Sequence, residues 1–504
     1  MRAARTWRTP AHAAAAALAC AVATLAIASS ASAQRVDWPR EQPPPPLDRR
    51  AMVFPHYEIR SLANGLQVIY VGHHEQPAVS VRMILRAGTA SDPAGKPGVA
   101  QFVGRLLDQG TTTRSAQEIA TTIDSIGGAL GVGAARELSF VDALVLKNDF
   151  DLALDLLSDV ARRPAFDPAE IERQRTQVLN SFQVSYEDPG YLAGVVFNRL
   201  VYGFHPYGMP QGGTPESVRA ITREDLVAFH RTHYLPNNAL IAVVGDVTAD
   251  EAFAGVERVL GDWPAGAVEP PAAGVETIPM PTRRLVVINR PGAVQTVIRA
   301  GHVALPRDHD DFLTFDLAIK ILGGDGGNRL AGVLRTDRQL TYSASADLAG
   351  QLLSGDFLAQ TDTRTEATAE ALRVMVDEIA RLRRDRVSRR ELRGAQDYLA
   401  GSFPITLETP NAIAARVLEA MLFGLDLDTI EQYPQRINAV TPREIQRAAE
   451  AHLHPDNLSI VLVGDASTFI RDLPAVGFDR IEVVPVAELD LTAPDLRRGG
   501  RRGQ

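Results

Sequence analysis

The feature that most constrains the fold of this 504-residue chain is an internal repeat. The repeated anchors occur in the same order in each half: Arg86-Ala-Gly88 and Arg299-Ala-Gly301, Thr222 and Thr441, His233-Tyr-Leu-Pro-Asn-Asn238 and His452-Leu-His-Pro-Asp-Asn457, and Val244-Gly-Asp246 and Val463-Gly-Asp465. Self-similarity at several separated positions indicates two copies of one structural unit. The fold must therefore be one that a single chain can build twice.

Local patterns within the first copy indicate what that unit contains. Apolar residues recur at helical spacing through Gly98–Gly110, and Gly110 is a typical helix stop. Asn64-Gly65 joins two strand-like runs as a hairpin turn, and Asn238–Asp246 contains a buried strand. We therefore predict an α+β fold of two homologous domains, each a mostly antiparallel sheet packed with helices, joined by a linker.

Shifts in composition mark the expected boundaries of these domains. A stretch rich in Pro, Gly and Ala in the middle of the chain is typical of an interdomain linker. We predict a signal peptide at 1–33, a Pro-rich lead-in at 34–50, an N-terminal domain at 51–263, the linker at 264–282, a C-terminal domain at 283–472 and a partly disordered tail at 473–504. The end of the tail is rich in Arg and Gly, which we interpret as solvated chain.

The N-terminus has the features of an export signal. Basic Arg2, Arg5 and Arg8 precede an apolar run, and Ala31-Ser-Ala33 has the small-x-small form of a cleavage site. Lipoprotein processing at Cys20 is the less favoured alternative, because the residues before it only loosely resemble a lipobox. No apolar run of the mature chain is long enough to span a bilayer, so we expect an exported protein that resides in the periplasm.

Charge and cysteine content exclude further classes of protein. The formal net charge of −9 lacks the basic footprint of a nucleic-acid-binding protein. Cys20 is the only cysteine, so removal of the signal peptide leaves no disulfide, no thiolate metal site and no cysteine nucleophile. The sequence also contains no spacing from which a Ser-His-Asp arrangement could be argued.

The order of short motifs around the helix at Gly98–Gly110 resembles the pitrilysin, insulin-degrading-enzyme and mitochondrial-processing-peptidase family of zinc peptidases. The shared features are the Asn-Gly hairpin, Arg86-Ala-Gly88 before the helix, Gly110-Thr111 after it, and Ile126-Gly-Gly128. In active members this helix carries His-x-x-Glu-His, in which two imidazoles hold Zn²⁺ and the glutamate is the general base. A glutamate on a later helix is the third zinc ligand.

The resemblance places degenerate residues at all four positions of that zinc site. Gln101, Gly104 and Arg105 stand where the helix motif falls, and Ser181 stands at the position of the third ligand. We therefore expect no family-type zinc site and no cofactor in this chain. Arg105 carries a permanent cation at a ligand position, and we expect it to form a salt bridge with an acidic neighbour rather than to act in catalysis.

The second half retains a signature that the first half lacks. A Gly-rich stretch at Gly323–Leu330 leads into a segment that holds Arg335 and Tyr342. This resembles the family's C-terminal signature, in which an Arg and a Tyr seven residues apart reach the zinc site of another domain. The resemblance thus assigns substrate or transition-state binding to Arg335 and Tyr342, since a Tyr hydroxyl can donate to an oxyanion and an Arg fork can grip a carbonyl or carboxylate. The Gly-rich stretch lacks the Gly-Lys-Ser/Thr ending of a phosphate-binding loop.

Two other groups of residues contain histidines at suggestive spacing. His73-His74-Glu75 falls at the end of a predicted strand, where adjacent side chains point to opposite faces. His230 and His233 are one helical turn apart near the end of a predicted helix. Because neither group has a third ligand in view, we interpret these histidines as solvated or hydrogen-bonded side chains and not as metal ligands.

These observations predict a non-catalytic, substrate-binding subunit of a heteromeric periplasmic zinc metallopeptidase. Some bacterial members of the family split the site between two chains, and the chain with His-x-x-Glu-His holds the zinc. The resemblance implies that Arg335 and Tyr342 act in trans on a peptide or unfolded polypeptide at the active site of such a partner. The alternative is an inactive peptidase homologue that serves as a binding or scaffold protein. An autonomous enzyme with a rebuilt site is the least favoured possibility.

Overall fold

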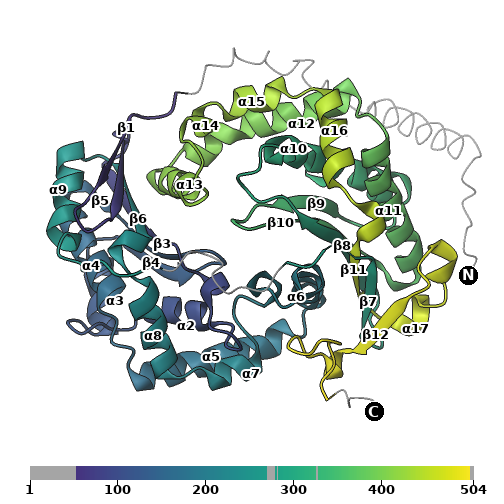
Figure 1. Ribbon diagram of the computed structural model, residues 1–504, viewed down its shortest axis with the longest axis horizontal. Coiled ribbons are helices and arrows are strands. Elements are labelled where there is room, and N and C mark those ends of the chain that lie inside the picture. Colours follow the sequence, from purple (N-terminus) through teal and green to yellow (C-terminus); the bar gives the residue numbers. More distant parts are fainter. Residues whose placement is uncertain (1–52, 269–277, 281, 325–326, 500–504) are drawn as a thin grey trace, which may run out of the picture. The chain divides into compact units, whose positions relative to one another are not determined.

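The computed structural model describes residues 53–268, 278–280, 282–324 and 327–499 and builds two six-stranded sheets from them (Figure 1). The predicted signal peptide and lead-in, and much of the predicted linker, lie outside the described residues. The first sheet contains β1 (Tyr57–Ser61), β2 (Gln67–Gly72), β3 (Ala78–Leu85), β4 (Ala129–Ala134), β5 (Ser139–Leu146) and β6 (Ala239–Gly245). The second contains β7 (Arg284–Asn289), β8 (Gln295–Ala304), β9 (Ala344–Ala349), β10 (Gly355–Arg364), β11 (Ser459–Gly464) and β12 (Ile481–Pro485).

Helices occupy most of the chain between the strands. The first half contributes α2 (Val99–Leu106), α3 (Ala116–Ser125), α4 (Phe150–Arg162), α5 (Pro168–Ser185), α6 (Pro189–Tyr202), α7 (Pro215–Ala220), α8 (Arg223–His233) and α9 (Ala249–Leu260). The second half contributes α10 (Phe312–Gly323), α11 (Thr368–Arg384), α12 (Arg389–Ser402), α13 (Pro410–Leu422), α14 (Asp428–Glu431), α15 (Tyr433–Ala439), α16 (Pro442–His452) and α17 (Ala466–Phe469). Within the described ranges, none of these helices has both the length and the apolar character that a membrane crossing requires.

Apart from the edge strands β1 and β12, the two sheets have matching strand orders, which confirms the predicted duplication. The orders are β1-β2-β6-β3-β5-β4 and β12-β7-β11-β8-β10-β9. Most neighbouring strands are antiparallel, and the parallel pairs are β2 with β6, β7 with β11, and β7 with β12. The predicted α+β class with mostly antiparallel sheets is therefore confirmed. Strand β12 lies in the segment predicted to be a partly disordered tail, so part of that segment completes the second sheet.

Equivalent helices in the two halves begin with the same capping arrangement. The Thr222 hydroxyl accepts a hydrogen bond from the backbone N–H of Asp225, and the Asp225 carboxylate accepts one from the backbone N–H of Thr222. Thr441 and Glu444 form the same reciprocal pair at the start of α16. Such capping boxes satisfy backbone donors that a helix leaves unpaired, which explains why a threonine recurs at this point of the repeat.

Each half has its own apolar core. In the first half, residues of β2, β3 and β6 pack against α2, α4, α8 and α9, and all seven residues of β6 are buried. In the second half, residues of β8, β10 and β11 pack against α10, α11, α12 and α16, and β11 is buried throughout. The burial of β6 and β11 along their whole length explains why each has a continuous run of apolar residues in the sequence.

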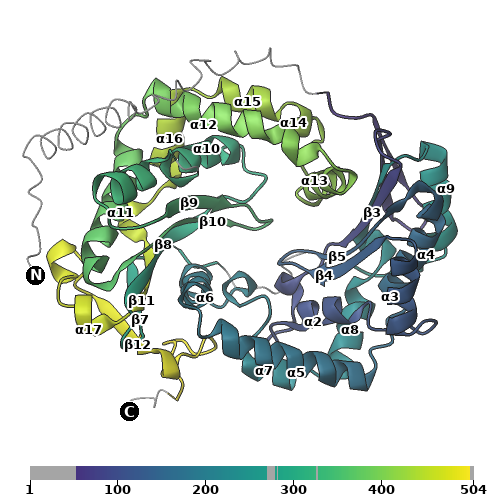
Figure 2. The ribbon, with the colours of Figure 1, turned by 180° about the vertical axis from the view of Figure 1, so that it is seen from behind.

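The two halves also exchange one helix each. Helix α6 belongs to the first half in sequence but packs against β8 and β11 of the second sheet, as Figure 2 shows. Its Phe197 is 1% exposed and belongs to one buried cluster with Val461 and Val463. Helix α13 belongs to the second half but packs against β3 and β6, where the Ser80 hydroxyl donates a hydrogen bond to the side-chain oxygen of Asn411 at 3.4 Å. Each half therefore needs the other to complete its packing.

Buried polar groups connect the halves at equivalent hairpins. Glu137, in the turn between β4 and β5, accepts hydrogen bonds from the Tyr207 hydroxyl and, at 2.7 Å, from the backbone N–H of Leu352 between β9 and β10. Tyr202 donates to the Asp356 carboxylate at 2.8 Å. Burial raises the pKa of both Glu137 and Asp356, and their hydrogen bonds to the tyrosine hydroxyls partly offset this effect.

Candidate functional site

Helix α2 is the helix that the sequence predicted at Gly98–Gly110. Its start is fixed by Gly98, which has a left-handed φ of 102°, and by the Asp92 carboxylate. That carboxylate accepts hydrogen bonds from the backbone N–H groups of Gly98 at 2.6 Å and Ala100 at 2.7 Å. The helix buries its apolar face in the first core. Helix α2 is therefore anchored at its start and along its apolar face, and this packing fixes where its polar side chains lie.

Two of the degenerate positions on α2 have ordinary surroundings. The Gln101 amide donates a hydrogen bond to the backbone carbonyl of Ala134 in β4. Arg105 is exposed, and among the residues that the structure describes it forms no ion pair. The salt bridge expected for Arg105 is therefore not found, because no carboxylate of this part of the chain comes within reach of its guanidinium.

Gly104 shows why the position of the catalytic base cannot be refilled in this packing. A Cβ atom built on Gly104 lies 2.7 Å from the backbone carbon of Gly133 and 2.9 Å from the backbone nitrogen of Ala134. Both neighbouring atoms belong to the backbone of β4, which cannot rotate away as a side chain can. Helix α2 therefore lies so close to β4 that a glutamate at position 104 has no space.

Ser181, at the position of the third ligand, lies on α5. Its side chain is exposed, and its hydroxyl donates to the backbone carbonyl of Val178 at 2.7 Å. Hydrogen bonds of this kind to the preceding helical turn are common for serine. The four residues at the degenerate positions contribute an amide, a hydrogen atom, a guanidinium and a hydroxyl, so the residues present do not fit a zinc ion.

The histidine groups considered from the sequence have structural roles. His74 Nδ1 lies 2.8 Å from the carboxylate of Asp246. His230 Nε2 lies 2.8 Å from the backbone carbonyl of Ala161, and its ring stacks on Tyr234. Burial lowers the pKa of His230 to about 4, so this imidazole is neutral at physiological pH.

A third group of possible ligands was not anticipated from the sequence. His309, Asp311 and His452 bring their ligand atoms within 4.8 Å of one another. Arg447, however, holds both carboxylate oxygens of Asp311, at 2.5 and 2.9 Å, and His452 Nε2 lies 2.8 Å from one of them. The guanidinium already supplies the positive charge that a metal would bring, so the group is explained as an ion-pair network.

The structure brings Arg335 and Tyr342 together. Arg335 lies on a π-helical turn, η5 (Ala331–Asp337), and its guanidinium carbon lies 5.0 Å from the centre of the Tyr342 ring. Between them lies Gln339, which has a left-handed φ of 54°. Single π turns and left-handed non-glycine residues are uncommon and often occur at functional sites.

Both members of this pair are accessible to a partner molecule. Tyr342 is 84% exposed, and Arg335 is also exposed. A tyrosine normally buries most of its ring, so the exposure of Tyr342 beside a guanidinium is unusual for a residue with a purely structural role. Their arrangement provides a hydroxyl donor and a forked cation on one surface, which is the chemistry needed to bind a carbonyl or carboxylate group.

Sequence models of one peptidase family match both halves of the chain. The model described as "Insulinase (Peptidase family M16)" matches residues 67–201, and the model described as "Peptidase M16 inactive domain" matches residues 220–399. The first match contains the degenerate positions of α2 and α5, and the second contains Arg335 and Tyr342.

Individual relatives agree with these matches. A Mycobacterium leprae protein named as an uncharacterized zinc protease is 28% identical over 78% of this chain and 88% of its own length. A crystal structure titled as a peptidase M16 inactive domain, from Pseudomonas fluorescens, is 28% identical with a TM-score of 0.76 and covers 81% of this chain and 98% of that chain. A protease structure from Helicobacter pylori shares the fold, with 20% identity, a TM-score of 0.77, and coverage of 82% of this chain and 100% of that chain.

Proposed function

This chain belongs to the M16 family of peptidases, and we propose that it is the non-catalytic, substrate-binding subunit of a heteromeric zinc peptidase. In this proposal a homologous subunit with His-x-x-Glu-His binds the zinc. The present chain supplies Arg335 and Tyr342 to the substrate at that subunit's active site. The assembly resides in the periplasm, to which the N-terminal signal directs the chain.

The observation that carries the proposal is the contrast between the two halves. The backbone of β4 lies so close to α2 that no space remains for a glutamate at Gly104, the position of the catalytic base. Arg335 and Tyr342, by contrast, lie together on an exposed surface that contributes little to the core. Side chains that are exposed, adjacent and placed on uncommon backbone are better suited to bind another molecule than to stabilise this one.

The chemistry proposed for this chain uses only the side chains of Arg335 and Tyr342, and the partner subunit supplies the zinc. The Tyr342 hydroxyl donates a hydrogen bond to the carbonyl oxygen of a bound peptide, and the bond strengthens as negative charge develops on that oxygen. The Arg335 guanidinium holds a second carbonyl or a carboxylate of the same peptide and so fixes its position.

The proposal is tested by reconstitution. The purified chain alone is expected to retain no stoichiometric zinc and to cleave no peptide. Mixed with a His-x-x-Glu-His subunit from the same organism, it should restore cleavage of a fluorogenic peptide. Arg335→Ala and Tyr342→Phe should each lower the restored cleavage rate by roughly 10²-fold, the loss typical of one transition-state donor. Matched controls are Arg338→Ala and Tyr398→Phe, because Arg338 pairs with Glu370 at 2.9 Å and Tyr398 is 51% exposed on α12.

The outcomes separate the proposal from its alternative. Restored cleavage that is unchanged by both variants would show that Arg335 and Tyr342 do not have the proposed role. Failure of the chain to associate with any zinc-binding homologue, together with binding to non-peptidases, would favour the scaffold function. Recovery of the native protein only from the cytoplasmic fraction would contradict the proposed location.

A further inference from the structure

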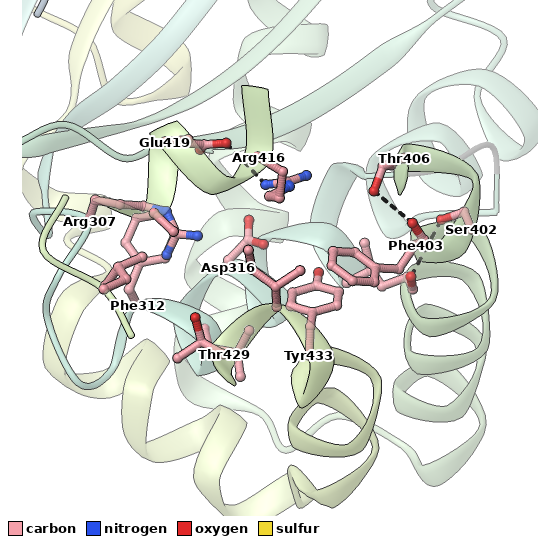
Figure 3. A pocket seen from close by; sticks show the side chains of 15 residues that line it. Arg307, Phe312, Asp316, Ser402, Phe403, Thr406, Arg416, Glu419, Thr429 and Tyr433 are labelled. Carbon is pink, nitrogen blue, oxygen red and sulfur yellow. Dashed lines mark hydrogen bonds and ion pairs between the residues drawn. The ribbon is translucent and has the colours of Figure 1, made fainter. Parts of the chain in front are cut away.

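A pocket in the second half lies among α10, α12, α13 and α15, and neither Arg335 nor Tyr342 lines it (Figure 3). Its volume is about 270 Å³, near the lower end of the range for small-molecule sites. The apolar part of the lining includes Phe312, Leu313, Leu399, Phe403, Leu425 and Ile430. A space of this size takes a group about as large as one amino-acid residue.

The arginine Arg307 lines one side of the pocket. The guanidinium carbon of Arg307 lies 4.6 Å from the centre of the Phe312 ring. Within the described ranges, no carboxylate oxygen lies within the 4.0 Å ion-pair distance of Arg307. Figure 3 shows its side chain directed toward the interior of the pocket, on the side opposite Phe403. A half-buried guanidinium normally has an anionic partner, so a ligand could supply one here.

A carboxyl group near the centre of the pocket is also poorly paired. Asp316 has a side chain that is only 18% exposed, and its nearest cation is Lys320 at 3.9 Å. Lys320 forms a closer ion pair with Asp347. Burial raises the pKa of Asp316 to about 6, so this carboxyl is largely neutral below that pH.

The charges of the lining leave one net positive charge when Asp316 is neutral. Arg416 pairs with Glu419 at 3.2 Å, so the charges of these two lining residues cancel. The cation that remains is Arg307. Below about pH 6 the lining is therefore electrostatically matched to a ligand with one negative charge.

A flat apolar surface lies across from that cation. Phe403 and Tyr433 stack with ring centres 4.3 Å apart and an angle of 27° between their planes. Thr406 and Ser402 add hydroxyl groups on the same side of the pocket. An aromatic or branched aliphatic group can pack on such a surface and keep a carboxylate at the cationic end.

The other half of the duplication indicates that the fold itself does not need these charges. Aligning Gly88 with Gly301, the repeated glycines before α2 and α10, places Val103 opposite Asp316. Aligning the first residues of α6 and α13 places Val195 opposite Arg416. Because apolar residues fill the same positions in the first half, the charged residues of the second half are candidates for binding.

We propose that this pocket binds a monocarboxylate joined to an apolar or aromatic group of single-residue size. Arg307 binds the carboxylate, and the stacked rings of Phe403 and Tyr433 contact the apolar group. The ligand is either the C-terminal residue of a peptide or a free small acid, which share this chemistry. The inference goes beyond the proposed function, because binding here requires no partner subunit.

The carboxylate is tested with a matched pair of probes on the full mature chain. N-acetylphenylalanine and its amide differ only in the charge that Arg307 is proposed to bind. Calorimetry at pH 5.5 should show the amide binding roughly tenfold more weakly or not at all. Equal binding of the two probes, or no binding of either, would overturn the proposal.

Variants locate the binding in the pocket. Arg307→Met keeps an unbranched stem against Phe312 but removes the charge, and it should weaken N-acetylphenylalanine binding by roughly tenfold. Arg364→Met removes an arginine whose side chain is 60% exposed outside the pocket, and it should leave the affinity within about twofold. Thermal unfolding of both variants checks that they are folded, and Arg307→Lys should recover part of the affinity because it restores the charge. An Arg307→Met protein that is folded and binds normally would exclude this site.

The pH dependence gives an independent readout. The charged or titratable groups that act on Asp316 come from the preceding loop, its own helix, β9 and α15: Arg307, Lys320, Asp347 and Tyr433. Ionisation of Asp316 adds a negative charge beside the bound carboxylate, so affinity should fall as pH rises through about 6. Asp316→Asn should remove this fall, and an unchanged pH profile in that variant would contradict the assigned role of Asp316.

A further probe distinguishes the two sources of the ligand. The peptide Ala-Ala-Phe with a free C-terminus presents the same carboxylate on a longer chain. If it binds at least as tightly as N-acetylphenylalanine, the pocket accepts peptide ends. If it is excluded while the small acid binds, the natural ligand is a free acid.

Discussion

At the scale of single residues, Gly104 determines what helix α2 can do. Its hydrogen atom allows the helix to approach β4 until a Cβ would lie 2.7 Å from the Gly133 backbone. We expect Gly104→Ala to lower the free energy of unfolding by about 1–3 kcal/mol, the usual cost of overpacking a core. Urea unfolding followed by circular dichroism measures this difference.

A glycine elsewhere in a helix provides the control for this experiment. Gly394 lies on α12, and a Cβ built there has no atom within 4 Å. Gly394→Ala should therefore raise the free energy of unfolding by up to about 1 kcal/mol, since alanine is the better helix former. If Gly104→Ala were as stable as wild type, the close approach of α2 to β4 would not be the reason for glycine at this position.

The residues of the two candidate sites differ in how far the sequence could predict them. Arg335 and Tyr342 lie in one short segment, so their pairing could be expected from a motif. The residues of the second-half pocket come from several segments between Arg307 and Tyr433 whose spacing has no recognisable period. Only the packing of the helices brings them together, so the pocket could not be predicted from the sequence. The space that excludes a glutamate at Gly104 is likewise a tertiary property.

At the scale of secondary-structure elements, the exchanged helices tie the two halves together. Phe197 on α6 is 1% exposed, and the end of its ring lies 2.8 Å from a Cβ atom built on Gly301 in β8. Phe197→Ala should lower the free energy of unfolding by about 3–5 kcal/mol, because the cavity would open between elements that cannot easily collapse. Thermal and urea unfolding can both measure this loss.

An exposed apolar residue on the neighbouring helix is a suitable comparison. Val184 on α5 is 74% exposed, so Val184→Ala should change stability by less than about 0.5 kcal/mol. A similarly small effect of Phe197→Ala would mean that α6 contributes little to the second core.

The sequence predicted many elements but not their partners. The turn predicted at Asn64-Gly65 joins β1 to β2, and in the structure Ser115, Asp167 and Thr222 cap the starts of α3, α5 and α8; caps and turns of this kind are local signals. An apolar helix surface shows that a helix will be buried, but it does not identify the sheet that covers it. The exchange of α6 and α13, and the addition of β12 to the second sheet, therefore emerged only from the structure.

At the scale of the whole molecule, the exchange predicts that the halves unfold as one unit. Calorimetry of the chain should give a single main transition, because neither core is complete without a helix from the other half. A fragment of residues 53–263 should not unfold cooperatively when expressed alone, since the apolar surface of α6 would lose the second sheet. Co-expression with residues 283–499 should restore a cooperative transition.

Two well-separated transitions would contradict this expectation, as would a 53–263 fragment that melts cooperatively by itself. The duplication could be predicted because short motifs recur along the sequence. These motifs indicate two similar domains, but they do not indicate that the packing of each domain requires a helix from the other. The dependence lies in contacts between α6 and β11 and between α13 and β3, which are far apart in the chain.

The position of α13 also sets an order of events during synthesis. The strands of the first sheet are complete once Gly245 has been made, yet the helix that packs against β3 and β6 ends only at Leu422. A ribosome adding roughly 5–20 residues per second needs about 10–40 seconds for the intervening stretch. For that time the first half carries an uncovered apolar surface, so its protection from aggregation depends on chaperones or on delayed folding until the second half emerges.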